Sequence, residues 1–242
     1  MLLFFLKNSY PAKLHKSPDL FLFRLIFRKI AAQTFKLMVY STAYLPPIAY
    51  WYFLSKDENP VIDIYEHFVK QTYRNRCEIY GANGKLSLTI PLVKENEHTP
   101  IKNRKISYAE NWQKNHWKSI ESAYRSSPYF EYYEQEFYDF FHKKDFELLV
   151  DFNTALMQKI MEILELSVPL KFSEKYIENV NTEEDLRLLT PKKELKILVF
   201  PRYIQVFENK KGFIPNLSIL DLLCNEGPQS VNYLQSIKRT NA

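Results

Sequence analysis

Glycine is scarce in this sequence of 242 residues, which contains only four: Gly81, Gly84, Gly212 and Gly227. Loops that cradle phosphate need clustered glycines, because their backbone N–H groups must approach the ligand closely. No glycine here follows a predicted strand and opens a helix. The sequence therefore excludes a P-loop and a dinucleotide-binding Rossmann fingerprint.

Cysteine and histidine are too sparse for a disulfide framework or a metal site. The two cysteines, Cys77 and Cys224, predict free thiols in a cytoplasmic protein. The five histidines show no metal-ligand spacing such as HExxH, so we expect neither a metal nor another cofactor. No apolar stretch is long enough to cross a bilayer, which argues against a transmembrane segment.

The net charge of +5 is distributed unevenly along the chain. Residues 1–37 contain seven basic residues and one acidic residue, a net charge of +6, whereas the remainder contains 26 basic and 27 acidic residues. Positive and negative residues are interspersed over this nearly neutral remainder, so it offers no basic surface for a phosphate backbone. Nucleic acid is therefore not expected as a partner.

Residues 1–37 are predicted to lie outside the folded domain, which we expect to occupy residues 38–242. One interpretation is that translation starts at Met38 and that the upstream residues are a mis-assigned start. The alternative is a peripheral membrane contact, in which the apolar and basic residues 20–37 lie on a membrane as an interfacial helix.

From Met38 onward, the apolar patterns predict an α/β fold of mixed α+β type. Alternating apolar residues on both sides of an Asn-Gly turn predict a β-hairpin over 73–93. Further strands are expected over 38–44, 61–66, 168–172 and 195–201 and within 101–108. Helices are expected over 48–55, 111–124, 129–142, 146–166, 217–225 and 231–237, with a short one starting at Thr182. The expected architecture is a small mixed sheet with an early hairpin, packed against a central group of helices.

His116 is the candidate catalytic residue. It shares an inward-facing helical stripe with Trp112, Ile120 and Tyr124. An inward histidine serves either as a general acid or base or as a hydrogen-bonded core residue. Cys77 is a second candidate, as a nucleophile beside His116, although a thiol in an alternating strand is ordinarily a packed core side chain.

The segment KQTYRNR before the hairpin concentrates basic and amide side chains. Two arginines and a lysine can clamp a carboxylate or phosphate. Alternation along a strand would place Arg74 and Arg76 on the same face. We therefore take Lys70, Gln71, Asn75 and Arg76 as candidate substrate-binding residues, with a solvated strand face as the alternative interpretation.

Polar residues also interrupt the apolar segment GFIPNLSILDLLCNEG near the C-terminus. Asn216 or Ser218 suits the N-cap of a helix, and Asp221 would lie in the first turn. Capping does not explain why Asp221 and Asn225 share a helix face at i, i+4 spacing. These four residues are therefore also candidates for a small polar binding site.

Several short motifs follow one another along the chain: YLPPIAYW (44–51), KQTYRNRCEI (70–79), LTIPL (88–92), SPYFE (127–131), YIQVF (203–207) and FIPNLSILDLL (213–223). Their number and order resemble the WbqC-like protein family. The resemblance covers residues 38–242 and none of 1–37, which agrees with a domain that starts at Met38. The sequence departs from longer members in having no glycine within 174–200.

The resemblance implies a transferase-type enzyme of surface polysaccharide (O-antigen-like) sugar biosynthesis, for example for acyl or aminoacyl transfer to an amino sugar. Its small-molecule substrate would be a nucleotide sugar or an acyl donor, with an anionic part bound by Asn75 and Arg76. His116 would act as acid or base, and the pocket would be lined by Tyr203, Gln205, Asn216 and Asp221. The alternative is a noncatalytic binding or assembly protein of an envelope pathway.

Overall fold

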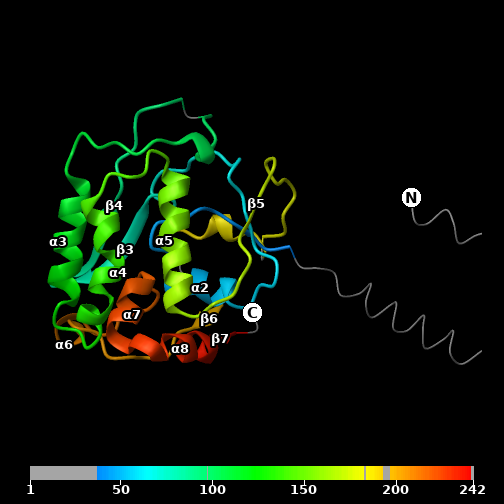
Figure 1. Cartoon of the computed structure of the whole chain (residues 1–242). Coiled ribbons are helices and arrows are strands. Elements are labelled where there is room, and N and C mark those ends of the chain that lie inside the picture. Colours follow the sequence, from blue (N-terminus) through cyan, green and yellow to red (C-terminus); the bar gives the residue numbers. More distant parts are fainter. Residues whose placement is uncertain (1–36, 97, 183, 193–196, 241–242) are drawn as a thin grey trace, which may run out of the picture. The chain divides into compact units, whose positions relative to one another are not determined.

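Three parallel strands of two residues each form the first sheet. They are β1 (Val39–Tyr40), β2 (Val61–Ile62) and β5 (Lys171–Phe172), in the order β1-β2-β5. Figure 1 shows the computed structural model and its elements. It describes residues 37–96, 98–182, 184–192 and 197–240. The extension predicted over 1–37 lies outside the described residues except for Leu37.

The predicted hairpin is confirmed, and it forms a sheet of its own. β3 (Arg76–Gly81) pairs with β4 (Gly84–Thr89) in antiparallel register, with Gly84 at φ 108° in the turn. Glycine suits this turn because it adopts a positive φ without a steric penalty. The strand begins at Arg76 rather than at residue 73. A third sheet pairs β6 (Leu198–Val199) with β7 (Lys238–Arg239).

Most of the predicted helices are present, and all of these but the last are shorter than predicted. The α-helices are α2 (Ile48–Leu54), α3 (Trp112–Tyr124), α4 (Phe130–His142), α5 (Leu149–Ile163), α6 (Glu208–Lys211), α7 (Ile219–Glu226) and α8 (Ser230–Ser236). The apolar stripe of α5 is buried as its spacing predicts. The mixed α/β class is therefore confirmed, with small separate sheets instead of one mixed sheet.

Two predicted elements are wrong. Ile101–Asn103 is a 3₁₀ turn after Pro100, and the residues beyond it make only isolated bridges, such as Leu92 with Ile106, instead of a strand. The helix expected from Thr182 is replaced by a second 3₁₀ turn, Leu186–Leu188. Its N-terminal cap is the Asp185 side chain, which accepts from the Arg187 amide. A third such turn is Gly227–Gln229.

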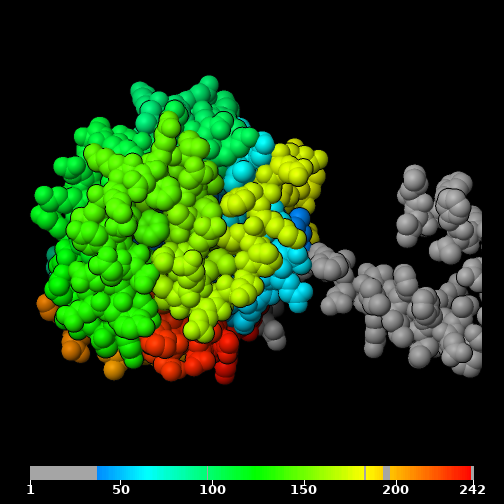
Figure 2. All heavy atoms as spheres, viewed as in Figure 1, coloured from blue at the N-terminus to red at the C-terminus, as the bar shows by residue number. Residues whose placement is uncertain are grey.

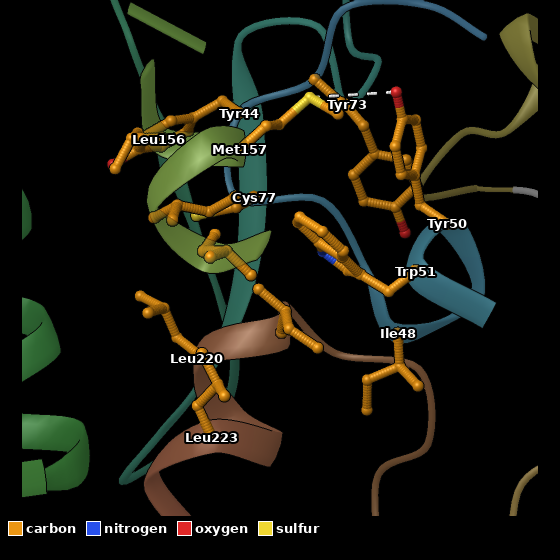
Figure 3. Close-up of a cluster of buried hydrophobic side chains, with 14 of the residues drawn as sticks. Tyr44, Ile48, Tyr50, Trp51, Tyr73, Cys77, Leu156, Met157, Leu220 and Leu223 are labelled. Carbon is orange, nitrogen blue, oxygen red and sulfur yellow. Dashed lines mark hydrogen bonds between the residues drawn. The ribbon is translucent and has the colours of Figure 1, made fainter. Parts of the chain in front are cut away.

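The core lies where α2, α5, α7 and β3 meet. Figure 3 shows Trp51 of α2 among side chains of these elements, including Cys77, Met157 and Leu220. All four side chains are buried, and they come from segments far apart in the sequence. This burial holds the N-terminal and C-terminal parts of the described fold together. Among the described residues, no helix has the length and apolar character needed to cross a bilayer.

Candidate functional site

Polar residues gather at the carboxyl end of the parallel sheet. Asp63 follows β2 directly and Ser173 follows β5, and the Ser173 hydroxyl donates to Asp63 Oδ1 at 2.9 Å. Carboxyl ends of parallel strands lie at one sheet edge, where open α/β sheets commonly bind ligands. Asp63 and Ser173 therefore lie at the edge of the sheet where a ligand site is expected.

Asp63 anchors Ser173, Ile177 and Arg187 to the sheet. Its side chain is fully buried and accepts four hydrogen bonds. The donors are the amides of Tyr65 and Ile177, the Ser173 hydroxyl, and the Arg187 guanidinium, whose Nη1 lies 2.6 Å from Asp63 Oδ2. A carboxylate offers about four lone-pair positions, so Asp63 is saturated and serves as a structural anchor.

Two ion pairs lie beside this anchor. Arg187 binds Asp185 through two bonds of 2.8 Å, from Nε to Oδ1 and from Nη2 to Oδ2. Arg74 binds Glu66 in the same two-pronged way, with Nε 2.8 Å from Oε1 and Nη2 bonded to Oε2. Arg74 Nη2 also lies 3.4 Å from the Arg187 carbonyl oxygen, which connects the two pairs. Such paired geometry compensates the burial of the charges.

A cleft of about 480 Å³ opens beside these pairs, a volume within the range of small-molecule sites. The cleft is formed by the segments 66–74 and 176–190. In Figure 2 the yellow atoms around 175 lie against the cyan ones around 60, as the pairing of β5 with β2 requires. Its lining residues are Glu66, His67, Val69, Thr72, Arg74, Tyr176, Asp185, Arg187, Leu188 and Thr190.

The ionic cluster has an uncompensated negative charge. Asp63, Glu66 and Asp185 face two guanidinium groups, those of Arg74 and Arg187, which gives −1 when all five are ionised. Burial raises the pKa of the Glu66 carboxyl from its ordinary 4.5 to about 7, although the Arg74 guanidinium acts in the opposite direction. Glu66 can therefore exchange a proton near neutral pH.

The segment 70–76 borders this cleft, but not through the residues predicted to bind substrate. Lys70 and Gln71 are exposed and do not line the cleft. Asn75 is buried and donates to the Ile90 carbonyl oxygen, and the Arg76 Nε donates to Thr89 Oγ1 at 3.1 Å. The expectation that Arg74 and Arg76 share a strand face is wrong, since Arg74 precedes the strand and is buried against Glu66.

His116 lies inside the core, 6% exposed. Its Nδ1 lies 2.9 Å from the Tyr44 hydroxyl, and a second hydrogen bond joins the ring to the Thr89 backbone. Burial lowers the pKa of His116 to about 4, so the ring is neutral at pH 7. The same effect raises the pKa of the Cys77 thiol, which opposes its ionisation to a nucleophile.

The C-terminal candidates form a buried polar network instead of a pocket wall. The Asp221 Oδ2 accepts from the Tyr203 hydroxyl at 2.5 Å and from the Gln205 amide at 2.7 Å. Gln205 also bonds both backbone polar groups of Ile214. Burial raises the pKa of Asp221 from 3.8 to about 6. These bonds fix the chain around 203–214 against α7.

Asn216, Ser218 and Asn225 have structural partners. Asn216 Oδ1 accepts from the amide of Ala49 at 2.8 Å, in the first turn of α2. Ser218 is the N-cap of α7 as predicted, and its hydroxyl also donates to the Leu45 carbonyl oxygen. Asn225 donates to the backbone carbonyl of Asp221. Helix capping and hydrogen bonds to the backbone therefore account for all three.

The expected pocket between the 70–76 segment, His116 and the 203–221 segment is not where the cleft lies. None of the predicted catalytic or substrate-binding residues lines the cleft, although Arg74, taken from the sequence as part of the clamp, does. The sequence-based reasoning missed Glu66, Asp185 and Arg187. The local signal for this site is the segment VIDIYE, in which Asp63 follows Val61–Ile62 and Glu66 follows Ile64–Tyr65. Among the described residues, no group of His, Cys, Asp or Glu is arranged to hold a metal ion.

The model of the WbqC-like protein family matches residues 42–199. The chain belongs to this family. The WbqC-like segment contains every lining residue of the cleft and ends before Tyr203 and the rest of the C-terminal network. A search of curated proteins and a search of solved structures each returned no match.

Proposed function

We propose that this WbqC-like protein is a transferase-type enzyme that modifies a sugar for surface polysaccharide synthesis, by acyl or aminoacyl transfer to an amino sugar. The observation that carries the proposal is the cleft at the carboxyl end of the parallel sheet, with Glu66 at its base. A buried, proton-exchanging carboxyl in a cleft is a common feature of catalytic sites. The family match supports this location because it contains the whole lining.

In the proposed reaction, the amino group of the sugar attacks the carbonyl carbon of an ester or thioester donor. A C–N bond forms, the bond from that carbon to the donor oxygen or sulfur breaks, and Glu66 accepts the proton lost by nitrogen. The same proton then passes to the leaving group. Glu66 takes this role instead of His116, because the His116 ring is neutral, buried and bonded to Tyr44 and to the Thr89 backbone.

The test is a transfer assay on the full chain with D-glucosamine as acceptor and acyl-CoA or aminoacyl thioester donors, read by mass spectrometry. We expect an N-acylated product that forms at least about a hundredfold more slowly with Glu66→Gln. The matched control is Glu78→Gln, since Glu78 is also ion-paired, to Lys85, but lies on the hairpin away from the cleft. Equal rates for wild type and Glu66→Gln would overturn the role of Glu66.

The second candidate function is a noncatalytic binding or assembly protein. It is favoured by the fact that both guanidinium groups of the cleft already have carboxylate partners, as in purely structural ion networks. This function predicts stabilisation by a ligand without a product. A thermal-shift screen against the same sugars and donors separates the two, because a rise of several degrees corresponds to about 1–2 kcal/mol of binding to the native state.

A further inference from the structure

Three apolar side chains at the mouth of the cleft are unusually exposed. Val69 is 51% exposed, Tyr176 49% and Leu188 44%. Leu188 and Val69 are aliphatic, and the Tyr176 ring is positioned by Arg187, whose Cζ lies 5.2 Å from the ring centroid. Both segments that line the cleft contribute to this group.

The charged residues at the base of the cleft restrict the charge of a ligand that could bind there. Arg74 and Arg187 are each bonded to a carboxylate, and the cluster carries −1 when Glu66 is ionised. A diphosphate or a free carboxylate would add negative charge to a buried site that already has an excess of it. A ligand that brings one positive charge would make the cluster neutral.

The acidic base and the apolar mouth of the cleft together favour a ligand with one positive charge and one apolar group. We infer that the cleft binds an aliphatic aminoacyl group, with its α-ammonium at the acidic base and its side chain against Val69, Tyr176 and Leu188. This inference rests on the proposed function and narrows it, because it selects an aminoacyl donor over a simple acyl donor and over a nucleotide sugar. Val69 and Leu188 become the residues that select the length of the donor side chain.

The test measures binding of three small amides to the full chain by NMR titration at pH 7. In each probe a neutral carboxamide replaces the carboxylate. Leucinamide has both features, glycinamide lacks the side chain, and 4-methylpentanamide lacks the ammonium. We expect leucinamide to bind at least about tenfold more tightly than either of the others, since a half-buried leucine side chain and one ionic contact each contribute on that scale.

The variant that tests the mouth is Val69→Ser/Leu188→Ser, which changes only exposed side chains. We expect it to abolish the preference of leucinamide over glycinamide. The matched control is Val199→Ser/Leu86→Ser, because Val199 and Leu86 are 50% and 40% exposed and do not line the cleft. This control should keep the full preference.

The outcomes separate the inference from the proposed function. Equal binding of leucinamide and 4-methylpentanamide overturns the ammonium contact, and an unchanged preference in the mouth variant overturns the side-chain subsite. Either result leaves the role of Glu66 in transfer intact if Glu66→Gln slows the reaction. Conversely, leucinamide binding that depends on the mouth, without any transfer product, overturns the proposed enzyme and supports the inferred ligand.

Discussion

Glu66 and Asp221 are two buried carboxyl groups with raised pKa values in very different settings. Glu66 is paired with a guanidinium and lies at the base of an open cleft. Asp221 is fully buried and accepts hydrogen bonds from the neutral groups of Tyr203 and Gln205. The sequence pattern predicted Asp221 as a binding residue, whereas nothing in it predicted Glu66.

The comparison shows that a perturbed pKa alone does not identify a site. Burial raises the pKa of both carboxyls, by a similar amount relative to their ordinary values. What distinguishes Glu66 is access to a cleft and an ionic neighbourhood with an excess negative charge. The Tyr203 and Gln205 groups that donate to Asp221 are uncharged, and their bonds hold the chain around 203–214 against α7.

The largest effect is expected from Arg74→Met. It leaves Glu66 buried without its partner and removes one of the two positive charges of the cluster. Breaking a buried pair in this way costs about 3–5 kcal/mol of unfolding free energy. Urea denaturation measures the loss. Arg76→Met serves as control, with a change within about 0.5 kcal/mol, since the bond from Arg76 to Thr89 lies at the surface.

Asp221→Ala should destabilise the protein by about 2–4 kcal/mol, because the Tyr203 hydroxyl and the Gln205 amide lose their buried acceptor. Asp221→Asn retains one acceptor oxygen and should cost less. Neither variant should change the affinity for leucinamide measured below the unfolding temperature. A specific loss of leucinamide binding would place Asp221 in the ligand site and remove the contrast with Glu66.

The pH dependence of stability offers a third test. The folded pKa of Glu66 is raised, so its contribution is fully present below pH 4.5 and is lost as the pH rises to about 7. The loss is on the order of 3 kcal/mol. Glu66→Gln should remove it, and the difference between the two stability profiles isolates Glu66 from other groups. A difference that stays constant from pH 4.5 to 7 would contradict the raised pKa.

The smallest effect is expected from His116→Gln, which keeps a hydrogen-bonding side chain near Tyr44 and should cost about 1 kcal/mol at pH 7.5. The folded pKa of His116 is lowered, so its contribution is present above pH 6.5 and is lost as the pH falls to about 4. The variant should therefore be less sensitive to acid over this range. Loss of transfer activity with unchanged stability would instead return His116 to the catalytic role predicted from the sequence.

The elements that the sequence predicted best are those with local patterns. The stripe of α5 and the Asn-Gly turn of the hairpin each involve neighbouring residues, so their periodicity is visible in the chain. The parallel sheet is different, since strands of two residues have no detectable alternation. Longer strands were expected at each of its positions.

The cleft was not predictable for a related reason. Its Asp63–Arg187 ion pair joins residues 124 positions apart, and nothing local marks them as partners. The motifs that carried the family resemblance pointed mainly to buried residues such as Tyr44, Asn75 and Gln205. Asn75 and Gln205 bond the backbone of Ile90 and Ile214, and the Tyr44 hydroxyl bonds the His116 ring, so these side chains support the fold. The domain boundary at Met38 stays a prediction.

Asp63 couples the residues that form one wall of the cleft, so that they should open together. Three of the four hydrogen bonds to this one carboxylate come from this wall, from Ser173, Ile177 and Arg187. Releasing any one of these donors leaves a buried carboxylate partly unsatisfied, which favours releasing the others as well. Opening of this wall should therefore be cooperative, as a local unfolding unit in which the Ile177 and Arg187 amides exchange hydrogen at a common rate.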